Sequence, residues 1–379
     1  MIQSCNLFRP KHQTTPYTLQ YPSHFPAPTI HNLIIFCMAT LMIQSCNLFR
    51  PKHQTTPYTL EYPSHFPAPT IPPTNELTVE GVRLGRHLFF DERLSGDNTQ
   101  SCNSCHLQES NFAEPFSFST GIDGAEGNVN AMILSNIAWQ QFFFWNGRVE
   151  SLEEQVKDPI LNPIEMHTTF VDVIEKLEQD AKYLELFERA YGTDEITEDG
   201  IANALAQYLR TMISGNSKFD QYTVGNYTLS PSEQIGFDIF NNEQGDCFHC
   251  HGAASSGYQL GAFGLLQFTN NGLDSVYMVG EGREGVTGNP ADRGKFKIPS
   301  LRNVEYSFPY MHDGRFQTLA QVVDFYNTGG HPSATIDPNM KAVGVGRNWS
   351  VTEKQGLIDF MKTFSDNTFL EDTAFTSPW

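Results

Sequence analysis

Hydrophobic positions recur at helical intervals from residue 74 onward. The clearest sets on one face are Leu77, Gly81, Leu84 and Leu88, and Ile201, Leu205, Tyr208, Leu209 and Met212. Spacings of three and four residues place side chains on one face of an α-helix. Alternating apolar and polar residues, which are typical of strands, are scarce in this part of the chain. The pattern therefore predicts a mainly α fold with long loops and few strands.

Capping residues predict where several of these helices begin and end. Ser230-Pro231-Ser232-Glu233 has the form of a capping box with proline at the first helical position. Thr318–Gln321 and Thr352–Gln355 have the same form. Gly192 and Gly329 are predicted helix ends, because glycine readily adopts the left-handed conformation that terminates helices.

A weak internal repeat relates the two halves of the chain. Residues 134–137, 145–148 and 151–156 match residues 301–304, 312–315 and 318–323, each at an offset of 167 residues. Scattered chance similarities do not keep one offset. We therefore predict two related domains that arose by internal duplication, at residues 74–215 and 216–379.

The first 71 residues contain a second and much closer repeat. Residues 1–30 recur at 42–71 with one change, Gln20 against Glu61. Both copies are rich in Pro, Thr and Tyr and lack hydrophobic periodicity, which is typical of an extended tether. The sequence thus predicts a duplicated segment at 1–30 and a tether at 47–73.

An 11-residue apolar run, Leu33 to Ile43, lies between these copies. Its length suits the hydrophobic region of a signal peptide and is too short to span a bilayer. Ile43-Gln44-Ser45-Cys46 resembles a lipobox, so residues 31–46 predict a periplasmic protein anchored to a bacterial membrane by a lipid on Cys46. Cys37 lies inside this segment, and Cys5 is the duplicate of Cys46. An untargeted apolar stretch is the alternative, because no Lys or Arg directly precedes the run.

Composition narrows the class of partner. With 39% hydrophobic and 18% charged residues, the chain is not a disordered polyelectrolyte. The net charge is −19, and residues 72–379 carry 20 basic and 42 acidic side chains. This charge repels nucleic acid and anionic membrane surfaces and favours a basic protein partner.

Two Cys-x-x-Cys-His motifs give the strongest chemical indication. They are Cys102–His106 and Cys247–His251, one in each half of the chain. In a c-type site two thiols add to the haem vinyl groups and the next residue presents its imidazole to iron. Zinc ribbons space their Cys pairs by about 15 to 20 residues, and redox CxxC motifs stand on a βαβ background. Neither alternative fits, so we predict two covalently bound haem c groups.

The sixth ligand of each iron decides between electron transfer and reaction with peroxide. The helix predicted after Thr318 has one face formed by Leu319, Val322, Val323 and Tyr326. Tyr326 can therefore face the haem at Cys247 and Cys250 and ligate its iron. Its counterpart at the 167-residue offset is Pro159, which has no side-chain donor. We expect one open haem, at Cys102 and Cys105, and one filled; an ordinary core tyrosine is the alternative for Tyr326.

Longer stretches resemble the bacterial dihaem cytochrome c peroxidases and their MauG-type relatives. The resemblance covers about residues 74–379 and runs through LFFDERLSGDNTQSCNSCH, FFWNGRVESLEEQVKDPILNPIEM, GDCFHCHG and KIPSLRNV followed by PYMHDGRFQTLAQVVDFYNTGG. It implies two cytochrome c-like domains. The N-terminal haem is then peroxidatic, and the C-terminal haem is the site of electron entry or storage.

The resemblance also implies roles for single residues. His106 and His251 match the proximal haem ligands, and Trp145 matches a tryptophan between the haems. Gln155 and Glu165 match the pair beside the peroxide site. Glu165 would take a proton from one peroxide oxygen and return it to the leaving oxygen, while Gln155 orients the peroxide. From spacing alone Glu165 is a surface residue and Trp145 a core residue.

A calcium site is a further implication of the resemblance. Asn130, with the backbone carbonyls of Ser307 and Pro309, matches an interdomain Ca²⁺ site, and oxygen-only ligation suits that ion.

Two departures favour MauG-like ligation. Peroxidases that need reductive activation carry a distal His where this chain has Gly121-Ile122. Tyr326 stands 14 residues after His312, where many peroxidases have Met, as it does in MauG-type proteins. An anionic oxygen donor stabilises ferric iron and lowers the reduction potential.

Three functions follow in order of preference. The first is a peroxidase that reduces hydrogen peroxide to water with electrons from a small, basic cytochrome c or cupredoxin. The second is a MauG-like oxidase that uses peroxide to modify a protein or organic substrate. The third is a dihaem electron carrier without turnover. The sequence is compatible with a homodimer.

Overall fold

The computed structural model describes residues 53–252 and 268–379. Residues Gln54–Trp379 form one compact unit. The predicted duplicated segment, signal peptide and lipid site at Cys46 lie outside the described residues. None of the described helices is long and apolar enough to cross a membrane.

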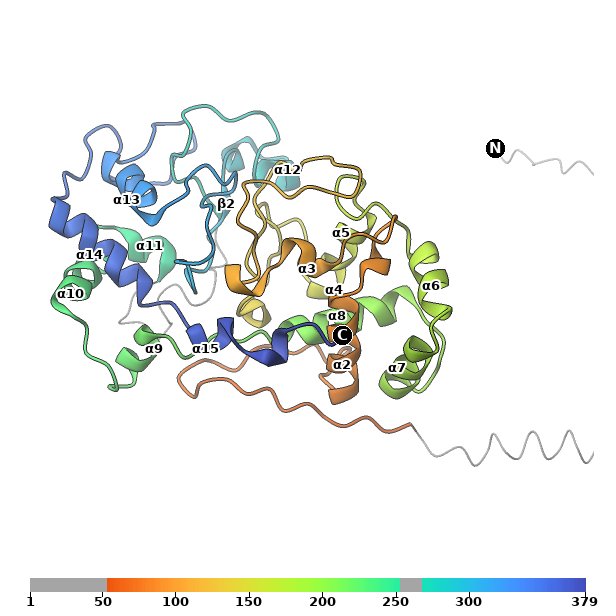
Figure 1. Ribbon diagram of the computed structural model, residues 1–379. Helices are drawn as coiled ribbons and strands as arrows, with labels where there is room; N and C mark the ends of the chain where they lie inside the picture. Colours follow the sequence, from red (N-terminus) through yellow and green to blue (C-terminus); the bar gives the residue numbers. More distant parts are fainter. Residues whose placement is uncertain (1–52, 253–267) are drawn as a thin grey trace, which may run out of the picture. The chain divides into compact units, whose positions relative to one another are not determined.

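Helices dominate the described part of the chain, as the hydrophobic spacing predicted (Figure 1). They are α2 (Val79–Phe89), α3 (Cys102–Cys105), α4 (Leu152–Gln155), α5 (Lys157–Leu161), α6 (Phe170–Glu178), α7 (Ala181–Tyr191), α8 (Glu198–Arg210), α9 (Lys218–Thr223), α10 (Pro231–Phe240), α11 (Cys247–His251), α12 (Glu284–Thr287), α13 (Leu319–Thr328), α14 (Val351–Lys362) and α15 (Asn367–Leu370). Short 3₁₀ turns are η1 (Glu92–Leu94), η2 (Gln108–Ser110), η3 (Ile137–Trp139), η5 (Pro290–Asp292) and η6 (Thr373–Phe375). Strands β1 (Phe268–Thr269) and β2 (Phe296–Lys297) pair antiparallel, with Phe268 opposite Lys297.

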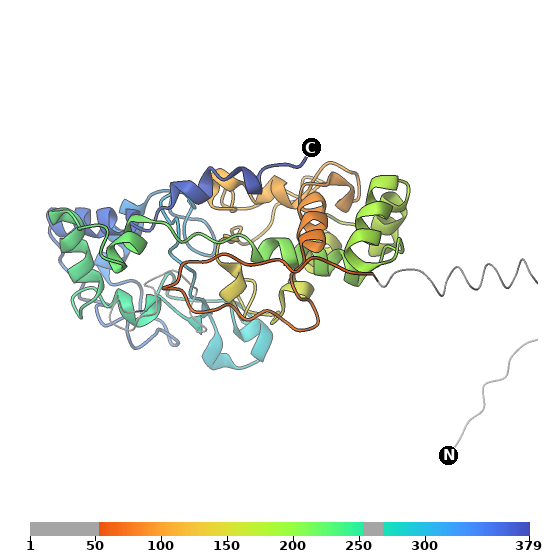
Figure 2. The same cartoon turned by 90° about the horizontal axis from the view of Figure 1, so that it is seen from below.

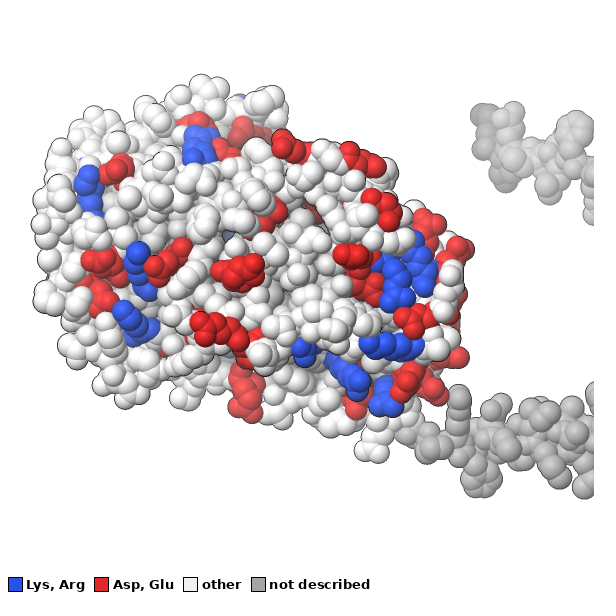
Figure 3. All heavy atoms as spheres, in the orientation of Figure 1, with Lys and Arg blue, Asp and Glu red and all other residues white. Residues whose placement is uncertain are grey.

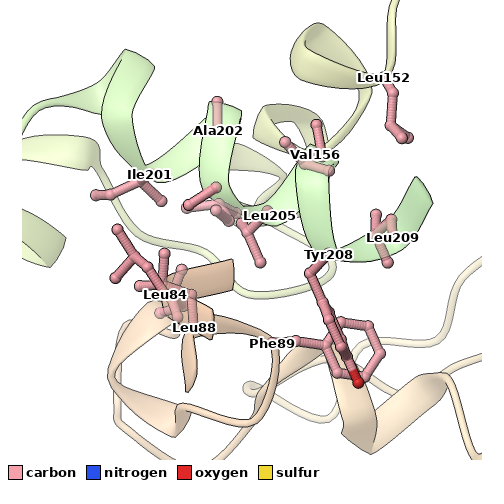
Figure 4. Close-up of a cluster of buried hydrophobic side chains, with 14 of the residues drawn as sticks. Leu84, Leu88, Phe89, Leu152, Val156, Ile201, Ala202, Leu205, Tyr208 and Leu209 are labelled. Carbon is pink, nitrogen blue, oxygen red and sulfur yellow. The ribbon is translucent and has the colours of Figure 1, made fainter. Parts of the chain in front are cut away.

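The first hydrophobic cluster is built around the crossing of α2 and α8. A Cβ on Gly85 would lie 1.9 Å from the Ala204 carbonyl oxygen, so the missing side chain lets the two helix backbones touch. Leu84 and Leu88 are fully buried on the same face. The rings of Phe89 and Tyr208 meet edge to face at 5.5 Å, beside this crossing (Figure 4). We call α2–α8 together with α15 and η6 the first lobe.

The second cluster repeats this arrangement with α10 and α14. A Cβ on Gly236 would lie 2.0 Å from the Gly356 carbonyl oxygen. Phe360 is fully buried there and packs on Phe219 at 5.6 Å. We call α9–α14 the second lobe.

The C-terminal residues pack on the first lobe, although the sequence placed them in the C-terminal domain. Phe369 and Phe375 belong to the first cluster and contact Phe112 at ring distances of 5.7 and 6.1 Å. Figure 1 shows this blue segment crossing back toward α2. Burial of the two aromatic rings explains the crossing.

Most predicted helix ends are confirmed. Ser230 and Thr318 cap α10 and α13 through capping boxes, and Gly192 and Gly329 end α7 and α13 in the left-handed conformation. The predicted capping box at Thr352 is wrong. Ser350 caps α14, because its hydroxyl accepts from the Glu353 amide while the Glu353 carboxylate accepts from the Ser350 amide at 2.7 Å.

Residues 54–73, predicted as part of a tether, lie along the folded body instead (Figure 2). Phe66 is 4% exposed, and Trp139 Nε1 donates to the Pro67 carbonyl at 2.8 Å. A Cβ on Gly215 would lie 2.4 Å from Pro63. The buried aromatic ring and these close contacts hold the segment, which corrects the tether prediction for these residues.

Local geometry follows the 167-residue offset. Asn136 and Asn303 both adopt positive φ, at 58° and 54°. The Asn136 amide donates to the Met212 carbonyl, two residues after α8, and the Asn303 amide donates to the Phe364 carbonyl, two residues after α14. Helices α4 and α5 together span 152–161, which is α13 shifted by 167.

Candidate functional site

The first Cys-x-x-Cys-His motif forms α3 and the residue after it. Ser101 and Ser104 cap this short helix reciprocally. The Nδ1 atom of His106 lies 2.6 Å from the Phe112 carbonyl oxygen, so Nδ1 carries the proton and donates. Burial lowers the pKa of His106. The ring is therefore neutral, with the lone pair of Nε2 available to a metal.

The second motif forms α11. It follows Asp246, whose φ of 57° turns the chain into the helix. Burial lowers the pKa of His251 to about 4, while the Pro299 carbonyl acts in the opposite direction. Nδ1 of His251 is buried and makes no hydrogen bond of standard geometry. This imidazole is also neutral, as iron ligation requires.

The four thiols have matching environments. Burial raises the pKa to about 12 at Cys102 and Cys247 and to about 11 at Cys105 and Cys250. All four are free and half-buried. Two neutral thiols followed by a neutral imidazole form the donor set for a covalently bound haem, and both motifs fit it.

A cavity of about 230 Å³ opens beside the second motif. Cys247, Cys250 and His251 line one part of it, and the predicted face of α13 lines another, with Leu319, Val322, Val323 and Tyr326. The Tyr326 hydroxyl accepts a hydrogen bond from Asn271 Nδ2 at 3.1 Å. Burial raises the pKa of Tyr326 to about 12. An iron ion in this cavity would have to displace that proton to bind the oxygen as phenolate.

The counterpart of Tyr326 in the first lobe is Pro159, inside α5. Proline lacks the amide hydrogen of a helix and its ring crowds the carbonyl four residues before it. This accounts for the break between α4 and α5 near Val156, whereas α13 is continuous. Pro159 presents no side-chain donor to a metal.

Glu165 lies near the first motif. Burial raises its pKa, and Asn162 Nδ2 donates to Glu165 Oε1 at 2.7 Å, which acts in the opposite direction. Its charge also raises the pKa of Cys105, so the carboxylate faces the motif. Glu165 is half-buried, which corrects the reading of a surface residue from spacing alone.

The segment at Gly121-Ile122 packs on the backbone around Glu165. The Ile122 amide donates to the Glu165 carbonyl at 3.0 Å, and a Cβ on Gly121 would lie 2.3 Å from the Ile164 carbonyl oxygen. Only glycine fits this close approach. The place of the distal His is thus taken by backbone that supports Glu165.

Gln155 ends α4 and is half-buried. Within the described part of the chain, no hydrogen bond joins its side chain to Glu165.

Trp145 lies where the two lobes meet. Its Nε1 donates to the Asn130 carbonyl at 2.9 Å, its ring lies 6.4 Å from that of His312, and its carbonyl accepts from the Lys297 amide at 2.7 Å. Trp145 also lines the cavity beside His251. This first-lobe side chain therefore reaches the second-lobe site.

The three predicted calcium ligands lie together. Asn130, Ser307 and Pro309 all line the same cavity. Asn130 Nδ2 donates to the Phe116 and Ser117 carbonyls at 3.0 and 3.4 Å, which orients its amide.

His249, between the cysteines of the second motif, points to a charged cluster instead. Its Nε2 lies 3.3 Å from Glu243 and 3.6 Å from Asp246. Lys341 also contacts Glu243 and lies 3.1 Å from Asp246. The ammonium group supplies the positive charge that this cluster would offer to a metal ion.

Sequence reasoning missed two buried charged residues near the site. Glu114 is 6% exposed, burial raises its pKa, and its charge raises the pKa of Cys105. Lys297 is 4% exposed in the wall of the cavity. Glu114 stands two residues after Phe112, and Lys297 opens the KIPSLRNV stretch, but neither position reveals burial in the sequence.

Two neutral CxxCH sites in one mainly helical body define a dihaem c-type protein. The family model of di-haem cytochrome c peroxidases matches residues 79–228. Cytochrome c551 peroxidase of Nitrosomonas europaea is 34% identical over 304 residues, covering 78% of this chain and 84% of the relative. MauG of Methylorubrum extorquens is 32% identical over 309 residues, covering 81% and 83%.

A solved structure agrees with these relatives. It is described as a MauG-like protein associated with microbial copper homeostasis, and it superposes with a TM-score of 0.78 at 32% identity, covering 85% of this chain and 99% of that one. The chain belongs to the di-haem cytochrome c peroxidase and MauG family. It is an oxidoreductase that acts on peroxide, and its family implies two haem c groups.

Proposed function

We propose that this protein reduces hydrogen peroxide to water with electrons from a small redox protein. The observation that carries the proposal is the difference between the two sites. A half-buried carboxylate, Glu165, faces the first motif, where Pro159 offers no ligand, whereas Tyr326 lines the cavity of the second. One site is then open to peroxide and the other suits electron storage.

Each lobe would hold one haem, through Cys102, Cys105 and His106 and through Cys247, Cys250 and His251. When bound, the haems supply iron that accepts peroxide in the first lobe and electrons in the second. Both imidazoles are neutral and can donate to iron.

The side chains around the first haem manage protons and position. Glu165, whose pKa is raised by burial, takes a proton from the near oxygen of peroxide and delivers it to the leaving oxygen. Asn162 holds the carboxylate in place at 2.7 Å. Gln155 orients the peroxide. Trp145 conducts electrons between the lobes, because it contacts residues of both.

A second candidate is a MauG-like oxidation of a protein or organic substrate. Tyr326 in the second cavity favours it, since phenolate ligation stabilises the more oxidised iron. Low-temperature EPR of the ferric protein should then show one high-spin haem, with Tyr326→Phe changing only the other signal. Two low-spin haems with His or Met character would contradict Tyr326 ligation.

The main test mixes the isolated, fully ferric protein with peroxide and a reduced small cytochrome c. Sustained oxidation of the cytochrome supports the peroxidase. A long-lived oxidised state with little turnover supports the MauG-like oxidase. A protein that does not react with peroxide contradicts both and leaves a dihaem electron carrier.

The donor we propose is a basic protein. On the face drawn in Figure 3, acidic side chains are spread over both lobes, and most basic ones adjoin them. The charge of residues 72–379 is −22, from 20 basic and 42 acidic side chains. Steering by this field predicts a turnover rate that falls as ionic strength rises. A rate indifferent to salt contradicts a basic donor.

Three further assignments complete the proposal. Ca²⁺ would bind Asn130 Oδ1 and the carbonyls of Ser307 and Pro309 between the lobes. The two lobes would derive from one duplicated ancestor, as the shared offset of 167 residues suggests. The protein would act in the periplasm, where c-type peroxidases meet their donors, and mass spectrometry of the extracted protein would report the haem count, cleavage site and lipid.

A further inference from the structure

One buried cation in the cavity has no acidic partner. Lys297 belongs to β2, is 4% exposed, and its Nζ donates to Gln140 Oε1 at 2.5 Å. In residues 53–252 and 268–379, no carboxylate forms an ion pair with it. Burial alone lowers its pKa to about 7. Because a buried, unpaired ammonium is costly, this position calls for an anion.

The other buried cation of the same cavity is already compensated. Arg347 Nη1 lies 3.2 Å from Asp246 Oδ2 and donates to the Gln244 carbonyl at 2.9 Å. Asp246 also pairs with Lys341. The contrast shows that the fold neutralises Arg347 with protein groups and leaves Lys297 with an amide oxygen.

Lys297 stands where the lobes meet at this cavity. Its amide donates to the Trp145 carbonyl at 2.7 Å, and Phe296 beside it stacks on His312 at 3.7 Å. Lys297, Trp145 and His251 all line the cavity. An anion that neutralises Lys297 must therefore come from whatever fills the space next to His251.

A haem bound there brings such an anion. Its vinyl groups react with the cysteines, and its two propionates remain carboxylates. We propose that Lys297 forms an ion pair with a propionate of the haem held by Cys247, Cys250 and His251, and that this pair raises the reduction potential of that haem. The proposal rests on the proposed haem attachment at these residues and not on reaction with peroxide.

The sign of the effect follows from charge. A propionate near ferric iron stabilises the oxidised state, and an ammonium on that propionate cancels part of this stabilisation. Removal of the Lys297 charge should therefore favour the oxidised haem. Lys297 acts as a positioning residue, since it touches a propionate rather than peroxide.

Spectroelectrochemistry of the dihaem protein tests this, with the two haems assigned by EPR at each potential. We expect Lys297→Gln to change the ratio of reduced to oxidised second-lobe haem at fixed potential by about tenfold or more toward oxidised, which corresponds to about 59 mV for one electron. Lys297→Arg should keep the wild-type potential. The matched control is Lys341→Gln, which removes an exposed ammonium near the same motif and should shift the potential less.

Three outcomes overturn the proposal. They are an unchanged second-lobe potential in Lys297→Gln, a shift confined to the first-lobe haem, and an equal shift in Lys341→Gln. A crystal structure of the haem-loaded wild type decides the matter even where the variant fails to mature: Nζ should lie within hydrogen-bond distance of a propionate oxygen, and Nζ remaining on Gln140 alone contradicts the pair. Peroxide turnover measured on the same samples separates this result from the proposed function.

Discussion

The two lobes hold their motifs in the same way and differ in what faces them. Each lobe has a glycine at its main helix crossing, at Gly85 and Gly236, and in each the first thiol of the motif has a pKa raised by burial to about 12. Facing the motifs, however, the first lobe has Pro159 and Glu165, and the second has Tyr326. The scaffold thus attaches a cofactor in both lobes, and a few side chains on the facing helix decide what each cofactor does.

The largest expected effect comes from removing the carboxylate that only the first lobe has. Glu165→Gln should lower the second-order rate constant with peroxide by about 10²–10⁴-fold, the usual contribution of a general acid-base. Stopped-flow absorbance of the ferric protein measures it. Glu150→Gln, at an exposed position nearby, is the matched control and should react like wild type. A Glu165→Gln protein that reacts at the wild-type rate would assign proton transfer elsewhere.

The second lobe carries a buried ion pair that the first lobe lacks. Arg302 Nη1 lies 2.6 Å from Asp220 Oδ2, and both side chains are fully buried. Burial raises the pKa of Asp220, but the Arg302 guanidinium and Ser217 outweigh it and hold that pKa below its usual range. The counterpart of Arg302 at the 167-residue offset is Ser135, whose buried hydroxyl has no hydrogen-bond partner.

Asp220→Asn should therefore lower the free energy of unfolding by about 3–5 kcal/mol, because it leaves a buried guanidinium uncompensated. Urea denaturation followed by circular dichroism gives this value. Ser135→Ala is the control, and it should be nearly neutral because it removes an unsatisfied group. Equal losses in both variants would show that the pair does not distinguish the lobes.

The glycine crossings predict that the lobes respond alike. Gly85→Ala and Gly236→Ala each force a Cβ to within about 2 Å of a carbonyl oxygen of the facing helix. We expect each to cost about 1–3 kcal/mol of stability, as overpacking usually does. Gly127→Ala meets only ordinary contacts, at 3.5 Å or more, and serves as control. A loss in one lobe alone would indicate that the other crossing relaxes.

The sequence predicted the elements whose information is local. Helical spacing found the buried face of α8, from Ile201 to Leu209, and the capping box at Ser230 placed α10. It failed at Thr352 because Ser350–Glu353 fits the same pattern two residues earlier, and only the hydrogen bonds distinguish them. It also missed the packing of Phe66, since a single aromatic in a segment without periodicity gains its burial from tertiary contacts.

The site divides in the same way. The CxxCH motifs and the face of Tyr326 were readable from spacing, and the structure places Tyr326 in the cavity of the second motif. Glu114 and Lys297 were not, because a charged residue in a sequence is normally solvated, and burial without a partner arises only when distant segments meet. Local pattern thus identifies cofactor attachment, while the groups that tune the cofactor depend on packing.

The smallest expected effect is a pH dependence that belongs to the first lobe alone. Glu165 must be deprotonated to accept the peroxide proton, and burial raises its pKa above the ordinary 4.5. The active form is present above that raised pKa and is lost as pH falls through it. We expect the rate constant with peroxide to fall several-fold between about pH 7 and pH 5 in wild type and in Tyr326→Phe, and to be flat in Glu165→Gln. Glu114 also has a raised pKa beside Cys105, so Glu114→Gln is the control that must keep the wild-type profile. A profile that disappears in Glu114→Gln and persists in Glu165→Gln would move the proton-transfer role to the other carboxylate of the same lobe.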